Sequence, residues 1–257
     1  MSAVGSGIVH LERAGAVAGI TLGDGTRHNA MRQHDWCELA RTFEVLADDD
    51  TLRCVTVRGG GPTFSAGSDI AEWDGASVEF ADESFRQMER AFQAVEALPV
   101  PVVAALRGVA TGAGLQLALA CDLRVAATDA RIGMPIARLG VLVTRAFADR
   151  VSCLAGAGLA RDLFYTGRLL SGADAFAHGL VERCVDPAEV DATTEAIVAQ
   201  IVALPPSSVR AAKAATSCRP GPPEPHSVDP GAFQAGVGSF LAARAARGGR
   251  RTGASAS

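Results

Sequence analysis

Segments that favour β-strands alternate along this chain with segments whose apolar residues recur at every third or fourth position. The alternation follows an N-terminal pair of strand-like segments joined by Ala14-Gly15, and it continues to about Leu204. Strands that alternate with amphipathic helices are typical of βα units, in which parallel strands are buried on both faces. The pattern therefore predicts an α/β fold. With 257 residues, 48% of them hydrophobic, the chain is long enough to bury a large core.

The individual elements follow from the strand period of two and the helix period of 3.6 residues. Strands are expected at Gly7–Arg13, Ala16–Leu22, Cys54–Val57, Val102–Leu106, Leu123–Ala127, Arg131–Met134 and Leu180–Val185. Helices are expected at Met31–Ala47, Glu79–Ala97, Leu115–Cys121, Arg145–Leu154, Leu159–Tyr165, Gly172–Ala177, Pro187–Leu204, Ser208–Ser217 and Gly231–Arg247.

The composition changes after residue 204. Pro205-Pro206 and the segment Pro220–Pro230 interrupt the helical pattern, and Gly248–Ser257 is small and polar, which is typical of disorder. We therefore expect a core domain at 1–204, a helical C-terminal section at 205–247 and a disordered tail at 248–257.

Charge and composition exclude several classes of partner. The formal net charge is −4 at pH 7 and the arginines are scattered, so the chain offers no clustered basic face to a nucleic acid. Apolar runs such as Val100–Leu106 and Leu115–Cys121 fall far short of the ~18 residues of a membrane span. The six cysteines include no CxxC pair, no spacing is typical of a metal site, and no basic-then-apolar leader opens the sequence. These features predict reduced thiols and a cytoplasmic location.

Three segments contain most of the residues that point to chemistry. They are Arg27–Met31 at the start of a predicted helix, Phe64–Ile70 after a predicted strand, and the apolar block Pro99–Val141. Within them, Ala66-Gly67-Ser68 and Gly112-Ala113-Gly114 form strand-to-helix turns of small residues, where backbone N–H groups can approach a ligand closely. A helix N-terminus also attracts negative charge. Taken alone, either turn is more often structural than functional. Their combination favours a binding site.

In their order and spacing, these segments resemble the enoyl-CoA hydratase/isomerase (crotonase) superfamily. The later stretches Tyr165–Arg168, Ala173–Val181 and Phe240–Arg244 agree with it, so the resemblance covers roughly residues 8–247. It implies a spiral of ββα turns and C-terminal helices that mediate trimer contacts. It also implies a homotrimer or a hexamer of two trimers, a coenzyme A thioester as the substrate, and no cofactor other than the CoA that the substrate carries.

The resemblance also assigns roles to residues at matching positions. It implies that the main-chain N–H groups of Ser68 and Ala113 form an oxyanion hole, because the thioester oxygen becomes negative when an enolate forms. It implies that the CoA moiety contacts Arg27, Ala66, Ser68, Asp69 and Ile70. A guanidinium suits the CoA phosphates, although Arg27 could equally be a solvated loop residue. For Asp69 we expect an Asx-type hydrogen bond within the loop rather than a role as a base.

Hydratases of this superfamily use two glutamates around one water molecule, and the matching positions contain neither. The resemblance places the first at Gln116 and the second at Ile136. A side-chain amide can hold a water or a carbonyl but does not usefully accept a proton, and isoleucine makes its wall of the site apolar. The sequence therefore does not support the standard hydratase mechanism.

Other residues could replace the missing acid. Asp149 and Arg145 lie near the second position, but a surface ion pair at a helix start is the favoured interpretation. Asp82, Glu83 and Glu89 lie on the helix after the CoA loop, where a solvated face is the favoured interpretation.

Three functions stay open from the sequence. The first is an acyl-CoA hydratase, isomerase or decarboxylase that relies on the oxyanion hole; decarboxylation needs enolate stabilisation but no glutamate base. Some decarboxylases of the superfamily use a tyrosine, but Tyr165 is interpreted as a packing residue. The second function is binding or carriage of acyl-CoA without turnover, which Gln116 and Ile136 favour. The third is a structural subunit beside an active homologue.

Overall fold

The structure is a computed structural model that describes residues 8–217. The chain falls into two compact units, Met1–Ala203 and Leu204–Ser257. The predicted linker at 220–230, the predicted helix at 231–247 and the predicted tail at 248–257 lie outside the described residues. Within residues 8–217, no helix has the length and the apolar character that crossing a membrane requires.

The larger sheet has the strand order β1-β2-β3-β4-β6-β9. Its first two strands, β1 (Val9–Ala14) and β2 (Val17–Leu22), form an antiparallel hairpin. The other strands join in parallel, as the alternating pattern predicts. They are β3 (Cys54–Gly59), β4 (Val102–Leu106), β6 (Leu123–Ala127) and β9 (Arg183–Val185).

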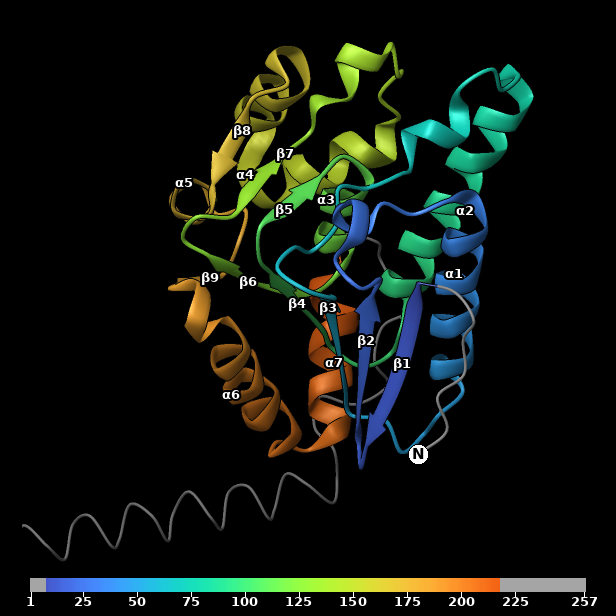
Figure 1. Cartoon of the computed structure of the whole chain (residues 1–257). Helices are drawn as coiled ribbons and strands as arrows, with labels where there is room; N and C mark the ends of the chain where they lie inside the picture. The colour runs from blue at the N-terminus through green and yellow to red at the C-terminus, as the bar shows by residue number, and fades with distance from the viewer. Residues whose placement is uncertain (1–7, 218–257) are drawn as a thin grey trace, which may run out of the picture. The chain divides into compact units, whose positions relative to one another are not determined.

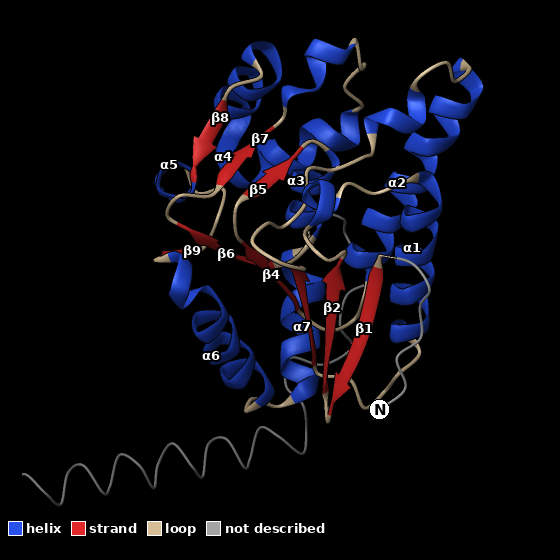
Figure 2. Ribbon diagram, viewed as in Figure 1, coloured by secondary structure: helices blue, strands red, loops and turns tan. Residues whose placement is uncertain are grey.

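A second sheet of three strands contains β5 (Val109–Thr111), β7 (Arg131–Gly133) and β8 (Leu169–Ser171). β7 pairs in parallel with β5 and antiparallel with β8. Figure 2 shows the two sheets as separate groups of strands; the chain places β4 and then β6 in the larger sheet, each followed by a strand of the smaller sheet, β5 and β7. A chain that adds one strand to each sheet and then a helix forms a spiral of ββα turns, so the predicted α/β fold class is confirmed.

Two long helices lie side by side against each other, α1 (Gln33–Ala47) and α2 (Val78–Ala97) (Figure 1). Each turns an apolar stripe inward, and the rings of Trp36 on α1 and Phe92 on α2 meet edge-on with centroids 5.4 Å apart. The helix α6 (Val190–Val202) packs on β3, β4 and β6.

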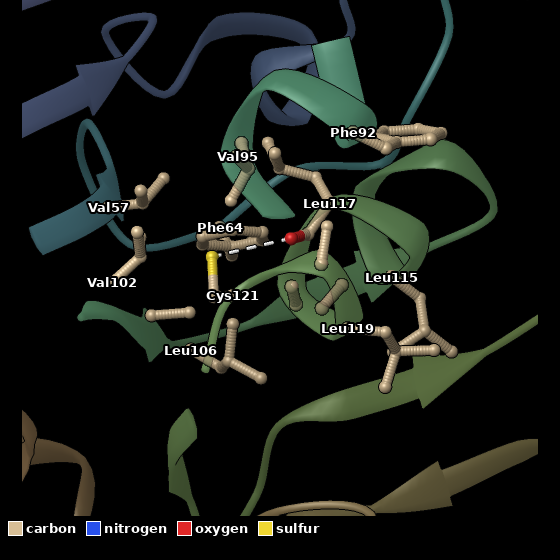
Figure 3. Packing of buried hydrophobic residues seen from close by; sticks show 14 of the residues in the cluster. Val57, Phe64, Phe92, Val95, Val102, Leu106, Leu115, Leu117, Leu119 and Cys121 are labelled. Atoms are coloured by element: carbon tan, nitrogen blue, oxygen red, sulfur yellow. Dashed lines mark hydrogen bonds between the residues drawn. The ribbon is translucent and has the colours of Figure 1, made fainter. Parts of the chain in front are cut away.

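The short helix α3 (Ala113–Ala120) is buried along its whole length. A helix that is apolar all round belongs in an interior, because it has no polar face to turn to water. Figure 3 shows Leu117 and Leu119 of α3 on different sides of the helix, with the Phe64 ring close to Leu117 and Cys121. The Cys121 thiol donates to the carbonyl oxygen of Leu117 at 3.4 Å. α3 is therefore held rigidly in the core, and its first turn is fixed in place.

The helix α4 (Arg145–Thr166) spans the region where two separate helices are predicted. Gly156 has φ 76° and ψ 159°, which interrupts the helix between the two predicted segments. The strands β5 and β8 are not predicted, because three residues are too few to show an alternation. The helix α5 (Gly172–Ala177) has the predicted bounds, whereas β9 is shorter than predicted.

In the second unit, the structure describes the helix α7 (Pro206–Thr216), which overlaps the predicted helix at 208–217. Pro206 stands at its first position, where an N–H group would have no acceptor within the helix.

Candidate functional site

The loop after β3 packs with its backbone directly against the N-terminus of α3. A Cβ atom at Gly67 would lie 2.8 Å from the amide nitrogen of Ala113, and one at Gly114 would lie 2.3 Å from the carbonyl oxygen of Ser65. Neither contact is compatible with a side chain, so glycine is required at both positions. The Ser65 N–H donates to Val109 of β5 at 2.9 Å, which fixes the loop to the small sheet. The two glycine turns found in the sequence are therefore brought together.

The amides of Ser68 and Ala113 lie in this contact without a hydrogen-bond acceptor among residues 8–217. Around Ser68, the Met31 N–H donates to the carbonyl oxygen of Gly67 at 2.8 Å, and the Asp69 N–H donates to the carbonyl oxygen of Met31 at 2.8 Å. The Ser68 N–H lies between these two hydrogen bonds. Ala113 is the first residue of α3, where a helix offers its amides no acceptor and where its dipole is positive. Two N–H groups are thus available for a ligand.

Gln116 lies just after this turn on α3, and its side chain is completely buried. Its Nε2 donates to the carbonyl oxygen of Phe147 at 3.2 Å, and its Oε1 accepts from Nη1 of Arg150 at 3.4 Å. Both polar atoms of the amide are therefore engaged by the protein. The orientation of the amide is fixed by its two partners on α4.

Arg150 forms a buried ion cluster behind Gln116. Its side chain is only 7% exposed; its Nη1 and Nη2 donate to Glu89 at 2.9 and 2.8 Å, and its Nε donates to Glu96 at 2.6 Å. The guanidinium also lies 5.1 Å from the centroid of the Phe92 ring. Desolvation by burial acts to lower the pKa of Arg150, but its bonds and charge interactions with Glu89 and Glu96 outweigh it and raise the pKa above its ordinary value. The cation is therefore permanent.

The interpretation of Glu89 as part of a solvated face is wrong, because its carboxylate is bound bidentately by Arg150 and is 22% exposed. Asp82, by contrast, is exposed as expected. Arg150 is not among the residues predicted from the sequence to be functional. The sequence feature that could have pointed to it is a charged residue in the apolar stripe of α4, between the buried residues Phe147 and Val151.

Ile136 lies in the 3₁₀ segment η3 (Pro135–Leu139) and is 9% exposed. Its Cγ2 atom would lie 3.8 Å from a Cβ at Gly112, the residue before Ala113. An apolar side chain thus lies beside the first turn of α3, close to the two unpaired amides.

Asp149 lies on the surface at the start of α4. It is 49% exposed, and its Oδ1 accepts from Nε of Arg145 at 2.7 Å. The interpretation of these residues as a surface ion pair at a helix start is confirmed. The structure does not bring Asp149 to Gln116, whose partners on α4 are Phe147 and Arg150.

Among residues 8–217, the Asp69 carboxylate makes no Asx-type hydrogen bond, so that prediction is wrong. Its buried carboxylate instead accepts from Nη1 of Arg27 at 2.6 Å and from Nε of Arg32 at 3.4 Å. Charge attraction to two arginines replaces the local turn bond, because the guanidinium groups reach the carboxylate from the neighbouring segment. The side chains of Arg27 and Arg32 stay 56% and 58% exposed, and Ile70 next to them is 53% exposed.

The segment that carries Arg27 has an unusual backbone. Arg27, His28 and Asn29 have φ of 48°, 54° and 53°, a left-handed conformation that is costly for residues with side chains. Buried Asn29 stabilises it, since its Nδ2 donates to the carbonyl oxygens of Gly60, Thr63 and Phe64 at 2.9–3.1 Å. The Ala66 N–H donates to His28 at 2.9 Å, which ties this segment to the glycine loop. Arg27, Ala66 and Ser68 therefore belong to one structural unit.

Two further groups of side chains lie apart from these amides. Tyr165 is 78% exposed in this chain, so its interpretation as a packing residue is wrong. His34, Asp35 and Glu38 place one ligand atom each within 4.8 Å of one another. The Asp35 carboxylate is already used, because Oδ2 accepts from the Arg32 N–H at 2.7 Å and Oδ1 contacts His34 at 3.0 Å. Asp35 therefore caps the start of α1, and its carboxylate is not free to bind a metal.

The fold and this loop arrangement define a class of α/β spirals in which a glycine loop packs against the N-terminus of a buried helix. A family model described as enoyl-CoA hydratase/isomerase matches residues 12–225. The chain belongs to this family, the crotonase superfamily.

Individual relatives agree with this membership. The chain is 33% identical to a crotonyl-CoA hydratase of Syntrophomonas wolfei over 74% of this chain and 73% of the relative. It is 34% identical to a putative enoyl-CoA hydratase/isomerase of Bacillus subtilis over 82% and 81%. An enoyl-CoA hydratase/carnithine racemase of Magnetospirillum magneticum has a similar structure, with a TM-score of 0.85, 32% identity and coverage of 93% and 94%. A putative enoyl-CoA hydratase of Thermobifida fusca in complex with CoA has a TM-score of 0.74, 34% identity and coverage of 80% and 82%.

Proposed function

We propose that this chain binds acyl-CoA thioesters and stabilises negative charge on the thioester oxygen with the main-chain N–H groups of Ser68 and Ala113. The observation that carries the proposal is the pair of amides that meet at the N-terminus of α3 and donate to no acceptor within residues 8–217. Donors held in place before the reaction stabilise an enolate oxygen well, because they need no reorganisation when the charge develops. No cofactor is required beyond the CoA of the substrate.

The proposal assigns the CoA moiety to Arg27 and to the loop Ala66–Ile70. Arg27 is held at one nitrogen by Asp69 and is otherwise well exposed, which suits contact with a phosphate. Support comes from the Thermobifida fusca relative, whose structure is a complex with CoA.

Addition of water by a pair of carboxylates is not part of this proposal. The positions that the family resemblance gives to the two glutamates hold Gln116 and Ile136 here. The Gln116 amide is buried, bonded at both polar atoms and unable to accept a proton usefully, and Ile136 is apolar. Hydration of an enoyl thioester would therefore need a proton acceptor from elsewhere.

A second candidate is decarboxylation of a malonyl-type thioester, which the apolar Ile136 beside the amides favours. In this reaction the bond between the α-carbon and the carboxylate breaks, CO₂ leaves, and the electron pair passes into the enolate held by the two amides. The α-carbon then takes a proton from water. An apolar wall promotes the step because it disfavours the charged carboxylate of the substrate.

The test measures binding and turnover on the same protein. Calorimetry with crotonyl-CoA and free CoA reports binding, loss of enone absorbance reports hydration, and CO₂ release from malonyl-CoA reports decarboxylation. We expect binding of both CoA compounds and negligible hydration. Hydration at the rate of an ordinary hydratase would contradict the proposal, and so would an absence of binding. Binding without any turnover would identify an acyl-CoA carrier.

The assembly and the location of the protein stay predictions. Sedimentation of the full chain tests the homotrimer or hexamer that the family resemblance implies, and fractionation of cells tests the cytoplasmic location.

A further inference from the structure

We propose that the acyl end of this site selects thioesters whose acyl group carries an aromatic ring. This inference rests on the proposed function and names the substrate class of the same site. It starts from a set of side chains that we call the aromatic row, made up of Trp73, Phe85, Phe147 and Phe92.

The aromatic row is continuous. The Trp73 and Phe85 rings stack with centroids 5.4 Å apart and an angle of 26° between their planes. Phe85 is 6.3 Å from Phe147, which in turn meets Phe92 at 6.0 Å with an angle of 63°. These are the offset and edge-to-face geometries that aromatic rings prefer. The row runs from Trp73, in the segment after the glycine loop, to Phe85 on α2, then to Phe147 in the first turn of α4, and ends at Phe92 on α2.

The two middle members of the row, Phe85 and Phe147, lie near residues of the proposed thioester site. The Ser68 hydroxyl contacts the sulfur of Met88 at 2.9 Å, so the face of α2 that carries Phe85 and Met88 lies against the loop that supplies the Ser68 amide. The next member, Phe147, is tied to α3, because its carbonyl oxygen accepts from Nε2 of Gln116, which follows Ala113 on that helix. The row therefore borders the region between the two amides and Gln116.

Within the row, exposure differs in a way that suits a ligand. Phe92, Phe147 and the adjacent Met88 are between 0% and 3% exposed, whereas Trp73 and Phe85 are only partly buried. The buried members hold the accessible pair in place. A ring on the acyl group would extend the stack of Trp73 and Phe85 and would contact the Met88 sulfur, which also favours aromatic partners.

The charge of Arg150, whose guanidinium lies 5.1 Å from the centroid of the Phe92 ring, is already compensated within the protein. This cation is bound by Glu89 and Glu96. An alkyl chain would gain only the general benefit of leaving water, whereas a ring adds favourable contacts between its edge and the faces of the row.

The test compares two saturated thioesters with nine acyl carbons each, 3-phenylpropanoyl-CoA and nonanoyl-CoA, by calorimetry on the full chain, with free CoA as the reference. Neither ligand can be hydrated or decarboxylated, so only binding is measured. We expect the phenyl compound to bind about tenfold more tightly, which corresponds to ~1.4 kcal/mol. Nonanoyl-CoA is the more apolar ligand, so equal or tighter binding of nonanoyl-CoA would overturn the inference.

Two variants of the row locate the effect. In Phe85→Leu and in Trp73→Leu, which replaces a partly exposed ring, we expect the ratio of the affinities for 3-phenylpropanoyl-CoA and nonanoyl-CoA to fall towards one. The affinity for free CoA should stay unchanged. The control is Phe176→Leu, an exposed ring on α5 outside the row, which should keep the preference. A preference that survives both row variants would also overturn the inference. If no CoA compound binds, the proposed function itself fails; if all bind without preference for the ring, only this inference fails.

Discussion

At the scale of single residues, the proposed chemistry of the site depends most on Gln116. It is fully buried, and its two polar atoms face a carbonyl oxygen of Phe147 and the guanidinium of Arg150. An amide satisfies both partners because it is a donor at one atom and an acceptor at the other. A carboxylate would satisfy Arg150 but would turn an oxygen towards the Phe147 carbonyl.

This geometry predicts the behaviour of Gln116→Glu. Burial and the facing carbonyl oxygen disfavour the charged form, and a protonated carboxyl can donate to Phe147 just as the amide does, so we expect the pKa of the introduced carboxyl to lie above the usual value of ~4.3. The pKa can be followed by infrared titration of the carboxyl band, with Gln116→Met as the baseline. A carboxyl that titrates at or below the usual value would show that Arg150 dominates instead. Because a protonated group is not a base, Gln116→Glu alone should not establish hydration.

A second prediction concerns the Ala113 amide. Proline is tolerated at the first position of a helix and has no N–H, so Ala113→Pro removes one of the two proposed donors to the thioester oxygen. A hydrogen bond weakens a carbonyl and lowers its stretching frequency. We therefore expect the frequency of a ¹³C-labelled thioester carbonyl to fall on binding to the wild-type chain, and to fall less in Ala113→Pro. Ala113→Ser, which keeps the N–H, is the control. An equal shift in both variants would contradict the assignment.

At the scale of elements, Arg150 links three helices around the site. It lies on α4 and binds Glu89 and Glu96 of α2 as well as Gln116 of α3. These contacts join segments that are far apart in the chain. The cluster thus fixes α4 relative to the helix that carries Ala113.

Replacement of Arg150 should therefore destabilise the fold. Arg150→Met leaves two carboxylates without their cation and the Gln116 oxygen without its donor, so we expect a loss of about 3 kcal/mol in the free energy of unfolding. Urea denaturation measures it. The variant that also carries Glu89→Gln and Glu96→Gln removes the unpaired charges, and it should recover part of the loss. If Arg150→Met is as stable as the wild type, the cluster makes no net contribution.

The short elements around the site were the hardest to predict. β5 and β8 have three residues each, and their pairing with β7 rather than any pattern of their own makes them strands. The longer helices α1 and α2 show a full apolar stripe, and their predicted and observed ends at Ala47 and Ala97 agree. A long element carries its own periodic signal, whereas a short one depends on its neighbours.

At the scale of the whole molecule, family membership leads to a prediction about assembly. The resemblance implies trimer contacts through the C-terminal helices, so we expect the full chain to sediment with three or six times the mass of one chain. Sedimentation velocity at several protein concentrations measures it, with the baseline given by the chain in strong denaturant. A stable single-chain mass under native conditions would contradict the prediction.

The two glycine turns of the candidate site could be found from the sequence alone, whereas the assignment of the Ser68 and Ala113 amides as donors comes from the family resemblance. Small residues such as Gly67 and Gly114 reveal where two backbones must approach closely, and this requirement is local. The alternation of strands and helices likewise determined the α/β class, because each element shows its buried face in its own periodicity.

Only the tertiary structure decided what surrounds those amides. Glu89, interpreted from the sequence as solvated, accepts from Arg150 with both carboxylate oxygens. The Asp69 carboxylate pairs with Arg27 and Arg32 instead of bonding to its own loop. The physical reason is the same in both cases. A charged side chain takes its partner from whichever element packs against it, and the sequence of one element does not specify its neighbours.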